Sequence, residues 1–204
     1  MDSIIKYFKS YEIDIEKNDI LFIKNIKIPN FYKENKNNPI IQWEFCHLLY
    51  KIFSNYLEKN TIIYENNLYD ISKNDIVLDC GANMGLFSAY AASKGATVYS
   101  FEPMSYTRNN FLNKTKSIYK NINIVPYGLK EKNKIEKFVQ CDNPGASHDI
   151  NININLDNKI LYVEDIKCIS LDFFCDFYNI KPTFIKMDVE GSEEQLLYGS
   201  KQIL

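Results

Sequence analysis

Residues 76–85, with the sequence IVLDCGANMG, constrain the fold of this chain more than any other segment. An apolar run of strand length ends at Asp79, and Gly81 and Gly85 then permit a turn tight enough for the main chain to approach a ligand. A helix must begin after this turn, and its first amide groups, unpaired within the helix, can bind an anionic or hydroxyl-bearing ligand. The segment therefore predicts a ligand-binding unit of strand, loop and helix.

A second run of β-branched and aromatic residues, 97–101, ends at Glu102 and Pro103. A carboxylate at the end of such a strand is placed to accept hydrogen bonds from ribose hydroxyls. Alone, Glu102 would also fit an ordinary solvated carboxylate, but its position before a helix-blocking proline favours ribose binding. Two adjacent strand ends would then form one nucleoside pocket, with Glu102 and Pro103 among its cofactor-binding residues.

The spacing of the glycines helps to distinguish between the possible nucleotide cofactors. A dinucleotide fingerprint G-x-G-x-x-G that starts at Gly81 would need glycine at positions 83 and 86, where this chain has Asn83 and Leu86. This disfavours a nicotinamide-dependent dehydrogenase. The residues expected to bind a cofactor in the first loop are Asp79, Gly81, Ala82, Asn83 and Gly85. Two roles fit Asp79, which can brace the loop or approach the cofactor itself.

Strand and helix patterns alternate from Thr61 onward, which predicts an α/β fold with a parallel sheet and right-handed crossovers. The expected strands are 76–79, 97–101, 122–125 and 183–187. The expected helices are 85–94, closed by Gly95, 106–116, 171–178, opened by Ser170 or Asp172, and one that begins at Ser192 with capping-box spacing to Gln195. Residues 134–140 and 161–170 look like strands that flank a polar loop, 141–154.

An N-terminal extension, residues 1–60, is expected to precede the main domain, residues 61–204. Residues 1–37 have the alternation of a partly exposed strand or hairpin, and Asn38 and Pro39 are typical of a helix start. Apolar residues then recur at helical spacing to about Leu57, which favours a core-facing stripe over a partner-binding face. His47 lies in this helix and is expected to be structural or solvated.

Several segments together resemble the FkbM-type methyltransferases. The pattern D-x-G-x-N-x-G at Asp79–Gly85 resembles the first motif of class I S-adenosylmethionine-dependent methyltransferases, with Asn83 where many members carry a glycine. The segments VPYGLKEKN, SLDFF and FIKMDVEGSEEQLLYGSKQIL follow in the family's order. The resemblance covers roughly Tyr64 to Leu204.

The resemblance implies a Rossmann-like sheet, S-adenosyl-L-methionine as cofactor and methyl transfer to oxygen. The implied acceptor is a small molecule or carbohydrate: first a sugar or glycan-precursor hydroxyl, second a secondary-metabolite hydroxyl. Tyr127 and Gly128 follow the third strand, where class I methyltransferases often place adenine contacts. A packed aromatic residue explains Tyr127 equally well.

Asp188 and Glu190 are the candidate catalytic residues. Both follow the fourth strand, whose carboxyl end faces the ligand crevice in open α/β sheets, and a carboxylate there can take the proton of an acceptor hydroxyl. Glu190 could equally cap the last helix. Lys186 is expected to be an ion-pair partner. His148 can act as an acid or base near neutral pH, but a plain surface histidine without an orienting partner is favoured.

A full class I sheet has strands beyond the fourth. The sheet of this chain is expected to stop after strand four and its helix, and therefore to be incomplete. This expectation keeps a second function open, a non-catalytic nucleoside-binding or scaffold module derived from a truncated methyltransferase.

Charge and cysteine usage narrow the functional class. A net charge of −2 shows no basic excess and predicts no nucleic-acid binding. No segment has the length of a spanning helix and the first residues lack a secretory apolar core, so no membrane association and a cytoplasmic location are expected. The five cysteines never form C-x-x-C and are expected to be reduced, packed thiols, and no metal site is predicted because the acidic residues are dispersed.

Overall fold

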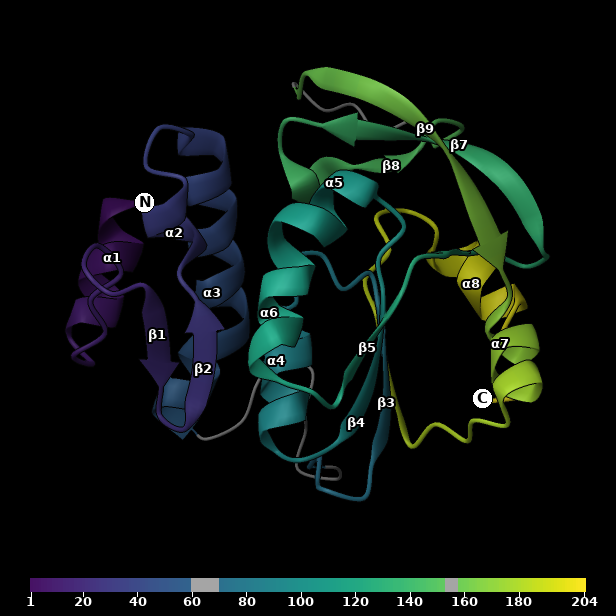
Figure 1. Ribbon diagram of the computed structural model, residues 1–204, viewed down its shortest axis with the longest axis horizontal. Coiled ribbons are helices and arrows are strands. Elements are labelled where there is room, and N and C mark those ends of the chain that lie inside the picture. Colours follow the sequence, from purple (N-terminus) through teal and green to yellow (C-terminus); the bar gives the residue numbers. More distant parts are fainter. Residues whose placement is uncertain (60–69, 153–157) are drawn as a thin grey trace.

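The centre of the molecule is a parallel sheet of four strands in the order β10-β3-β4-β5 (Figure 1). The computed structural model describes residues 1–59, 70–152 and 158–204. The strands are β3 (Ile76–Cys80), β4 (Thr97–Phe101), β5 (Ile122–Val125) and β10 (Phe184–Met187). Every boundary agrees with its expected position to within one residue, so the predicted α/β fold with a parallel sheet is confirmed.

Helices cover both faces of this sheet (Figure 1). Helix α4 (Leu86–Ser93) and helix α6 (Asn113–Ile118) lie on one face, while α7 (Leu171–Tyr178) and α8 (Glu193–Tyr198) lie on the other. Val77 packs into the first layer and Leu78 into the second, and both are fully buried because successive side chains of a strand point to opposite faces. Burial on both faces explains why the strand is a continuous apolar run.

The helix ends follow the expected signals with one exception. Gly95 has a φ of +92° after α4, and the Ser170 hydroxyl accepts a hydrogen bond from Phe173 N at 3.1 Å before α7. The capping box predicted from Ser192 and Gln195 is wrong. The Ser192 hydroxyl accepts a hydrogen bond from Lys130 Nζ at 3.0 Å instead, and Glu193 Oε1 accepts one from Val189 N at 2.9 Å.

The N-terminal residues form the expected hairpin together with helices that were not expected. Strands β1 (Ile20–Ile23) and β2 (Ile26–Pro29) pair antiparallel, while α1 (Asp2–Lys9) and α2 (Phe31–Glu34) precede and follow them. Helix α3 (Pro39–Lys59) begins as predicted, because Asn38 Oδ1 accepts a hydrogen bond from Ile41 N at 3.2 Å. The predicted boundary at residues 60 and 61 lies outside the described residues.

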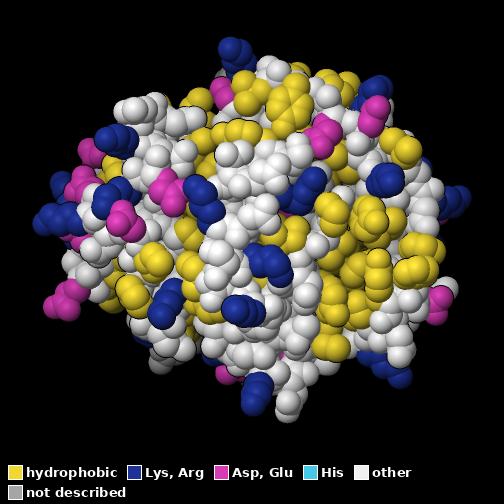
Figure 2. All heavy atoms as spheres, in the orientation of Figure 1, with side chains coloured by type: hydrophobic (Ala, Val, Ile, Leu, Met, Phe, Trp, Pro, Cys, Tyr) yellow, Lys and Arg dark blue, Asp and Glu magenta, His cyan; other side chains and the backbone are white. Residues whose placement is uncertain are grey.

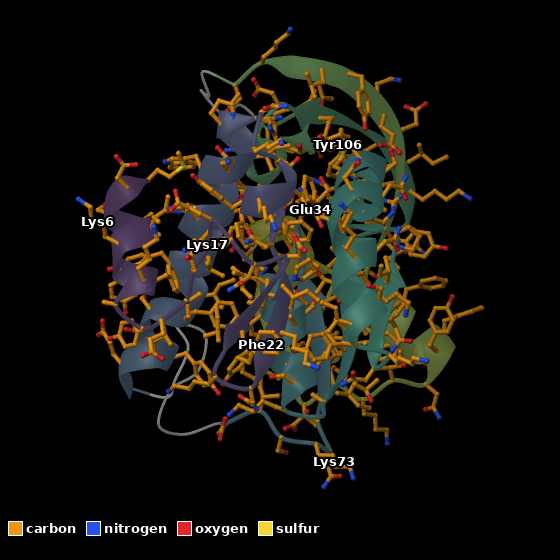
Figure 3. All side chains as sticks on the ribbon, turned by 60° about the vertical axis from the view of Figure 1, so that its left-hand side comes forward. Lys6, Lys17, Phe22, Glu34, Lys73 and Tyr106 are labelled. Atoms are coloured by element: carbon orange, nitrogen blue, oxygen red, sulfur yellow. The ribbon has the colours of Figure 1, made fainter. Side chains whose placement is uncertain are left out.

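The hairpin and α2 pack against the outer side of α4 and α6. Leu21, Ile28 and Phe31 are fully buried in the same hydrophobic cluster as Phe87 and Tyr90 of α4. Glu34 lies on the side of the extension that faces α6, where it forms an ion pair of 2.5 Å with Lys114, whereas Lys6 and Lys17 lie at the outer surface (Figure 3).

The helix expected at 106–116 is divided into three parts. A short helix, α5 (Ser105–Thr107), is followed by a π-helical turn, Arg108–Leu112, and then by α6. π-Helical turns within helices are often found at functional sites because they redirect side chains. This turn directs Arg108 toward the end of β4, as described below.

A second sheet, of order β6-β9-β7-β8, lies across the top of the view in Figure 1. Its strands are β6 (Gly128–Leu129), β7 (Lys134–Cys141), β8 (His148–Asp149) and β9 (Ile160–Ile169). The two strands predicted at 134–140 and 161–170 are therefore confirmed, and they pair antiparallel. The polar loop between them, described up to residue 152, contains a 3₁₀ turn (Pro144–Ala146) and β8.

The outer face of α7 is rich in exposed apolar side chains. Phe173, Phe177 and Tyr178 are 45%, 67% and 54% exposed, and apolar atoms gather on this side of the molecule (Figure 2). Within the described residues, none of the helices has both the length and the apolar character needed to cross a membrane. All five cysteines are buried free thiols, as expected.

Candidate active site at the carboxyl ends of the strands

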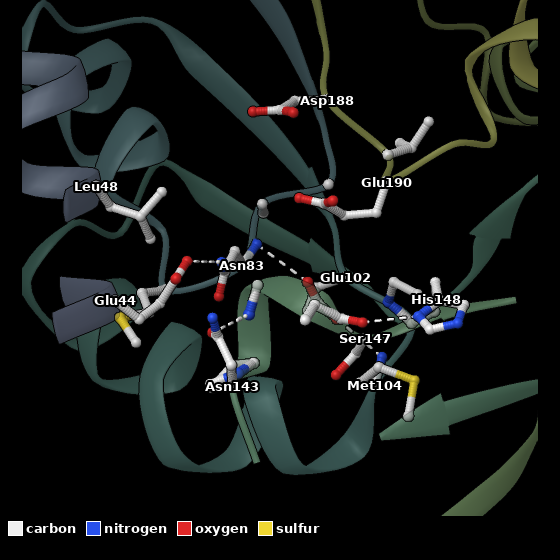
Figure 4. A pocket seen from close by; sticks show the side chains of 18 of the residues that line it. Glu44, Leu48, Asn83, Glu102, Met104, Asn143, Ser147, His148, Asp188 and Glu190 are labelled. Atoms are coloured by element: carbon white, nitrogen blue, oxygen red, sulfur yellow. Dashed lines mark hydrogen bonds between the residues drawn. The ribbon is translucent and has the colours of Figure 1, made fainter. Parts of the chain in front are cut away.

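A pocket of about 680 Å³ opens where β3, β4 and β10 end (Figure 4). Its floor is made by the loops after these strands. Its walls come from α3 on one side and from the loop 143–148 of the second sheet on the other. Nine of the eleven residues predicted to bind cofactor or to catalyse line it, namely Gly81, Ala82, Asn83, Glu102, Pro103, Tyr127, Gly128, Asp188 and Glu190.

The loop after β3 is held between the two neighbouring strands. Gly81 has a φ of +80°, and a Cβ atom there would overlap the carbonyl oxygen of Asp188. The amides of Gly81 and Ala82 both donate to the Phe101 carbonyl, at 3.1 and 2.9 Å. Asn83 also has a positive φ, of +49°. Only glycine at position 81 lets the loop fit this closely against the end of β10.

Glu102 is buried at the end of β4, with 7% of its surface exposed. Its Oε2 accepts a hydrogen bond from Asn83 N at 3.0 Å, and its Oε1 accepts one from Met104 N at 2.9 Å. Burial raises the pKa of Glu102 to about 7, although these amide hydrogen bonds oppose the shift. The carboxylate thus links the loop after β3 to the end of β4, while ribose binding by Glu102 stays a prediction.

Arg108, which the sequence analysis did not single out, holds the main chain around Glu102. Its Nη1 donates to the Glu102 carbonyl at 2.9 Å and also to the Pro103 carbonyl. It is the only arginine in the chain. A planar guanidinium with several fixed donors can hold two carbonyls at once, which a lysine ammonium does less well.

Asp79 and Gly85 were predicted to bind cofactor but lie behind the loop. Asp79 is fully buried, and its Oδ2 accepts a hydrogen bond from the Ser88 hydroxyl at 2.6 Å. Gly85, with a φ of +81°, faces Leu112 and Thr115 of the neighbouring helix. Both therefore support the loop from within the core. For Asp79, this corresponds to the bracing role of the two that the sequence left open.

Lys186 connects the buried acid to the loop. Because Lys186 is in register with Asp79 across β10 and β3, its Nζ lies 3.2 Å from Asp79 Oδ1. The same Nζ donates to the Gly81 carbonyl at 2.7 Å and lies 4.0 Å from Asp188 Oδ2. The expected ion-pair role of Lys186 is confirmed, and it stabilises the loop through three neighbours.

The two candidate catalytic acids occupy different environments. Asp188 Oδ2 forms an ion pair of 3.2 Å with Lys51 Nζ of α3. Glu190 has a positive φ, of +48°, which is an uncommon conformation for a residue other than glycine. Its pKa is raised to about 7, first by desolvation and then by the negative charges of Asp188 and Glu44. Glu190 therefore titrates near neutral pH.

The sequence model of the methyltransferase FkbM domain matches residues 79–204 of this chain. The chain belongs to the FkbM methyltransferase family. The matched residues contain the loop after β3, Glu102, Tyr127, Gly128 and the two acids, so the family match and the pocket coincide. No curated protein and no solved structure matches the chain.

Helix α3 lies outside the matched FkbM residues and yet forms one wall of the pocket. Glu44 is 5% exposed, and its Oε1 accepts a hydrogen bond from Asn83 Nδ2 at 3.4 Å (Figure 4). Burial raises the pKa of Glu44, and a Cβ atom on Gly145 would overlap its carboxylate. The predicted core stripe of α3 is buried as expected. The sequence analysis did not predict that the adjacent face, at positions 43, 44, 47 and 51, lines the pocket.

Both histidines line the pocket of this FkbM chain, which the sequence analysis did not predict. His148 was expected to be a plain surface residue without an orienting partner. Its Nδ1 lies 2.7 Å from the carbonyl oxygen of Ala146, and its side chain faces the pocket (Figure 4). The turn at residues 144–146 provides this partner. The sequence alone did not reveal the turn, because the loop takes this shape where it folds against α3.

Proposed function

We propose that this chain transfers a methyl group from S-adenosylmethionine to a hydroxyl oxygen of a small molecule or carbohydrate. The observation that carries the proposal is Glu102, which is buried at the end of β4 and hydrogen-bonded to the first loop. The family match supports methyl transfer in general. A sugar or glycan-precursor hydroxyl is the first choice of acceptor, and a secondary-metabolite hydroxyl is the second.

The pocket fits S-adenosylmethionine in size and in chemistry. Its volume of about 680 Å³ lies within the range of small-molecule sites. Asn83 Oδ1 is buried and, among the described residues, has no hydrogen-bond partner, so it can accept a hydrogen bond from a ligand. The residues that would hold the cofactor are the main chain of 81–83 together with Glu102, Pro103, Tyr127 and Gly128.

The charges of the pocket favour a cationic ligand. Glu44, Glu102, Asp188 and Glu190 line it, and the cationic side chains among its lining residues are Lys51 and Lys186. S-adenosylmethionine supplies a methyl group on a positively charged sulfur, which an oxygen nucleophile can attack. Those of the acidic groups that are ionised stabilise such a positive charge in a partly desolvated site.

Glu190 is the better general base of the two acids. A base works best when its pKa is near the working pH, and the pKa of Glu190 is about 7. Asp188 is held by Lys51 at 3.2 Å, which fixes its position. Glu190 would accept the proton of the acceptor hydroxyl, and Asp188 would position Lys51 and raise the pKa of Glu190.

Calorimetry with S-adenosylmethionine and S-adenosylhomocysteine tests the proposal. Replacement Glu102→Ala should weaken binding by about 2 kcal/mol, or about 30-fold, since hydrogen bonds to a charged group are lost. Glu194→Ala, an exposed acid on α8, is the control and should bind like the native chain. Binding of NADH but of neither sulfur compound would contradict the proposal. Unchanged affinity in Glu102→Ala would remove Glu102 from the site.

A further inference from the structure

The rings of Trp43 and His47 stack on each other in the wall of the pocket. They lie one helical turn apart on α3, with their centroids 5.0 Å apart and their planes at 4°. Both line the pocket, and Trp43 is 47% exposed. It is also the only tryptophan in the chain. A large exposed aromatic ring in a pocket wall is a common feature of ligand-binding surfaces.

The same face of α3 leads from this surface to the catalytic acids. Lys51 follows His47 by one further turn, and its Nζ pairs with Asp188 Oδ2 at 3.2 Å. The eight residue steps from Trp43 to Lys51 span about 12 Å along the helix axis. A ligand one or two rings long, seated on Trp43 and His47, can therefore extend toward Glu190 and Asp188.

Polar groups surround the aromatic surface. Glu44 lies beside Trp43 in the sequence, and Asn143, Ser147 and His148 line the pocket from the loop of the second sheet (Figure 4). Each of these groups already makes a hydrogen bond within the protein, but each keeps a further donor or acceptor that a wholly apolar ligand would leave unmatched. A pyranose ring suits the site better, because it has apolar C–H faces for the stacked rings and a rim of hydroxyl groups for the amide, hydroxyl and carboxylate groups.

We propose that Trp43 and His47 form an acceptor subsite that binds a neutral sugar ring by its C–H face. The inference rests on the proposed methyl transfer and specifies its acceptor. Because α3 lies outside the residues that match the FkbM domain, the acceptor preference of this chain is set by a segment added to that domain. Trp43 and His47 position the sugar and take no part in the chemistry.

Tryptophan fluorescence tests the subsite directly, since Trp43 is the only source of the signal. The chain would be titrated with methyl glucopyranoside, methyl mannopyranoside and methyl fucopyranoside, with and without S-adenosylhomocysteine. At least one glycoside should change the emission of Trp43 saturably. His47→Ala should raise the Kd of that glycoside at least threefold while the signal remains readable.

Calorimetry on Trp43→Ala and Trp43→Phe completes the test. The glycoside Kd should rise at least tenfold in Trp43→Ala and less in Trp43→Phe, while the affinity for S-adenosylhomocysteine stays unchanged. Phe177→Ala is the matched control, because Phe177 is an exposed aromatic residue outside this pocket. It should leave both affinities unchanged.

Three results would overturn the subsite. The first is an emission change with S-adenosylhomocysteine but with none of the glycosides. The second is saturable binding of catechol but of no glycoside. The third is an unchanged glycoside affinity in Trp43→Ala. In the first case Trp43 would belong to the cofactor site, and the proposed function would stand. Failure of both sulfur compounds to bind would count against the proposed function alone, because the glycoside titration is read without them.

Discussion

Asp188 and Glu190 show how two acids, two positions apart, acquire different properties. Asp188 has Lys51 as an ion-pair partner, with Lys186 close by, whereas the pKa of Glu190 is raised to about 7 by desolvation and by neighbouring negative charge. A general base works best when its pKa lies near the working pH, and the pKa of Glu190 is about 7. The division of roles follows from the surroundings of each carboxylate.

The pH dependence of transfer should report Glu190. With S-adenosylmethionine saturating, so that Glu102 does not contribute through cofactor binding, kcat/KM for the acceptor should rise with pH through an inflection near 7 as Glu190 loses its proton. Glu190→Gln should lower kcat by about 100-fold or more and remove the inflection. Steady-state rates between pH 5 and pH 9 measure both effects.

Asp188→Asn provides the comparison for this profile. Since the negative charge of Asp188 contributes to the raised pKa of Glu190, its removal should shift the inflection to lower pH without abolishing it. If the inflection persists in Glu190→Gln and disappears in Asp188→Asn, then Asp188 is the base and the assignment is wrong.

At the level of elements, a buried ionic cluster joins the second sheet to the last helix. Lys130, directly after β6, has 3% of its side chain exposed and lies 2.6 Å from Asp149 of β8 and 3.7 Å from Glu136 of β7. Its Nζ also donates to Ser192 at the start of α8. Burial acts to raise the pKa of Asp149, but its interactions with Glu136, Lys130 and Asn151 outweigh burial and lower the pKa to about 2. The cluster thereby anchors the segment that carries Glu190.

Replacement Lys130→Met should cost about 3–5 kcal/mol of unfolding free energy, because it leaves buried carboxylates without their cation. Urea denaturation measures the loss. Lys137→Met, which removes an exposed ion pair with Asp165, is the matched control and should cost less than about 1 kcal/mol. Equal losses in the two variants would show that the buried cluster has no special role.

At the scale of the whole molecule, the N-terminal segment and the FkbM domain share one hydrophobic core. Phe31 of α2 is fully buried, with its ring centroid 5.6 Å from that of Phe45 in α3 and 5.2 Å from that of Phe111 beside α6. The cluster that contains these rings extends from Phe8 to Ile122. Because the apolar contacts are continuous, the two segments should unfold together.

Phe31→Ala should lower the unfolding free energy by about 3–5 kcal/mol, through lost burial and a cavity at the junction. Thermal unfolding followed by far-ultraviolet circular dichroism and by Trp43 fluorescence should give one coincident transition in the native chain and in the variant. Phe22→Ala on β1, where the ring is 57% exposed, should change stability little. Two separated transitions would mean that the extension and the domain unfold independently.

The sequence by itself determined the central sheet and the floor of the pocket. Strand β3 is a short, largely buried apolar run, β4, β5 and β10 are short strands of the same parallel sheet, and the carboxyl ends of parallel strands must meet at one edge. Gly81 and Glu102 could therefore be placed from local pattern alone, since their roles depend on backbone conformation and on position at a strand end.

Only the tertiary structure decided which side chains complete the site. Trp43, Glu44 and Lys51 precede the first loop by some thirty to forty residues, and no local pattern shows which face of α3 lies against the sheet. Asp79 is enclosed by Ser88 of α4 and Lys186 of β10, and Gly85 lies against Leu112 and Thr115. The pKa of Glu190 likewise depends on Asp188, which is two positions away in the sequence, and on Glu44, which is distant in the sequence. Burial and charge at a site are set by all the chain segments that meet there, so they appear only when those segments have packed together.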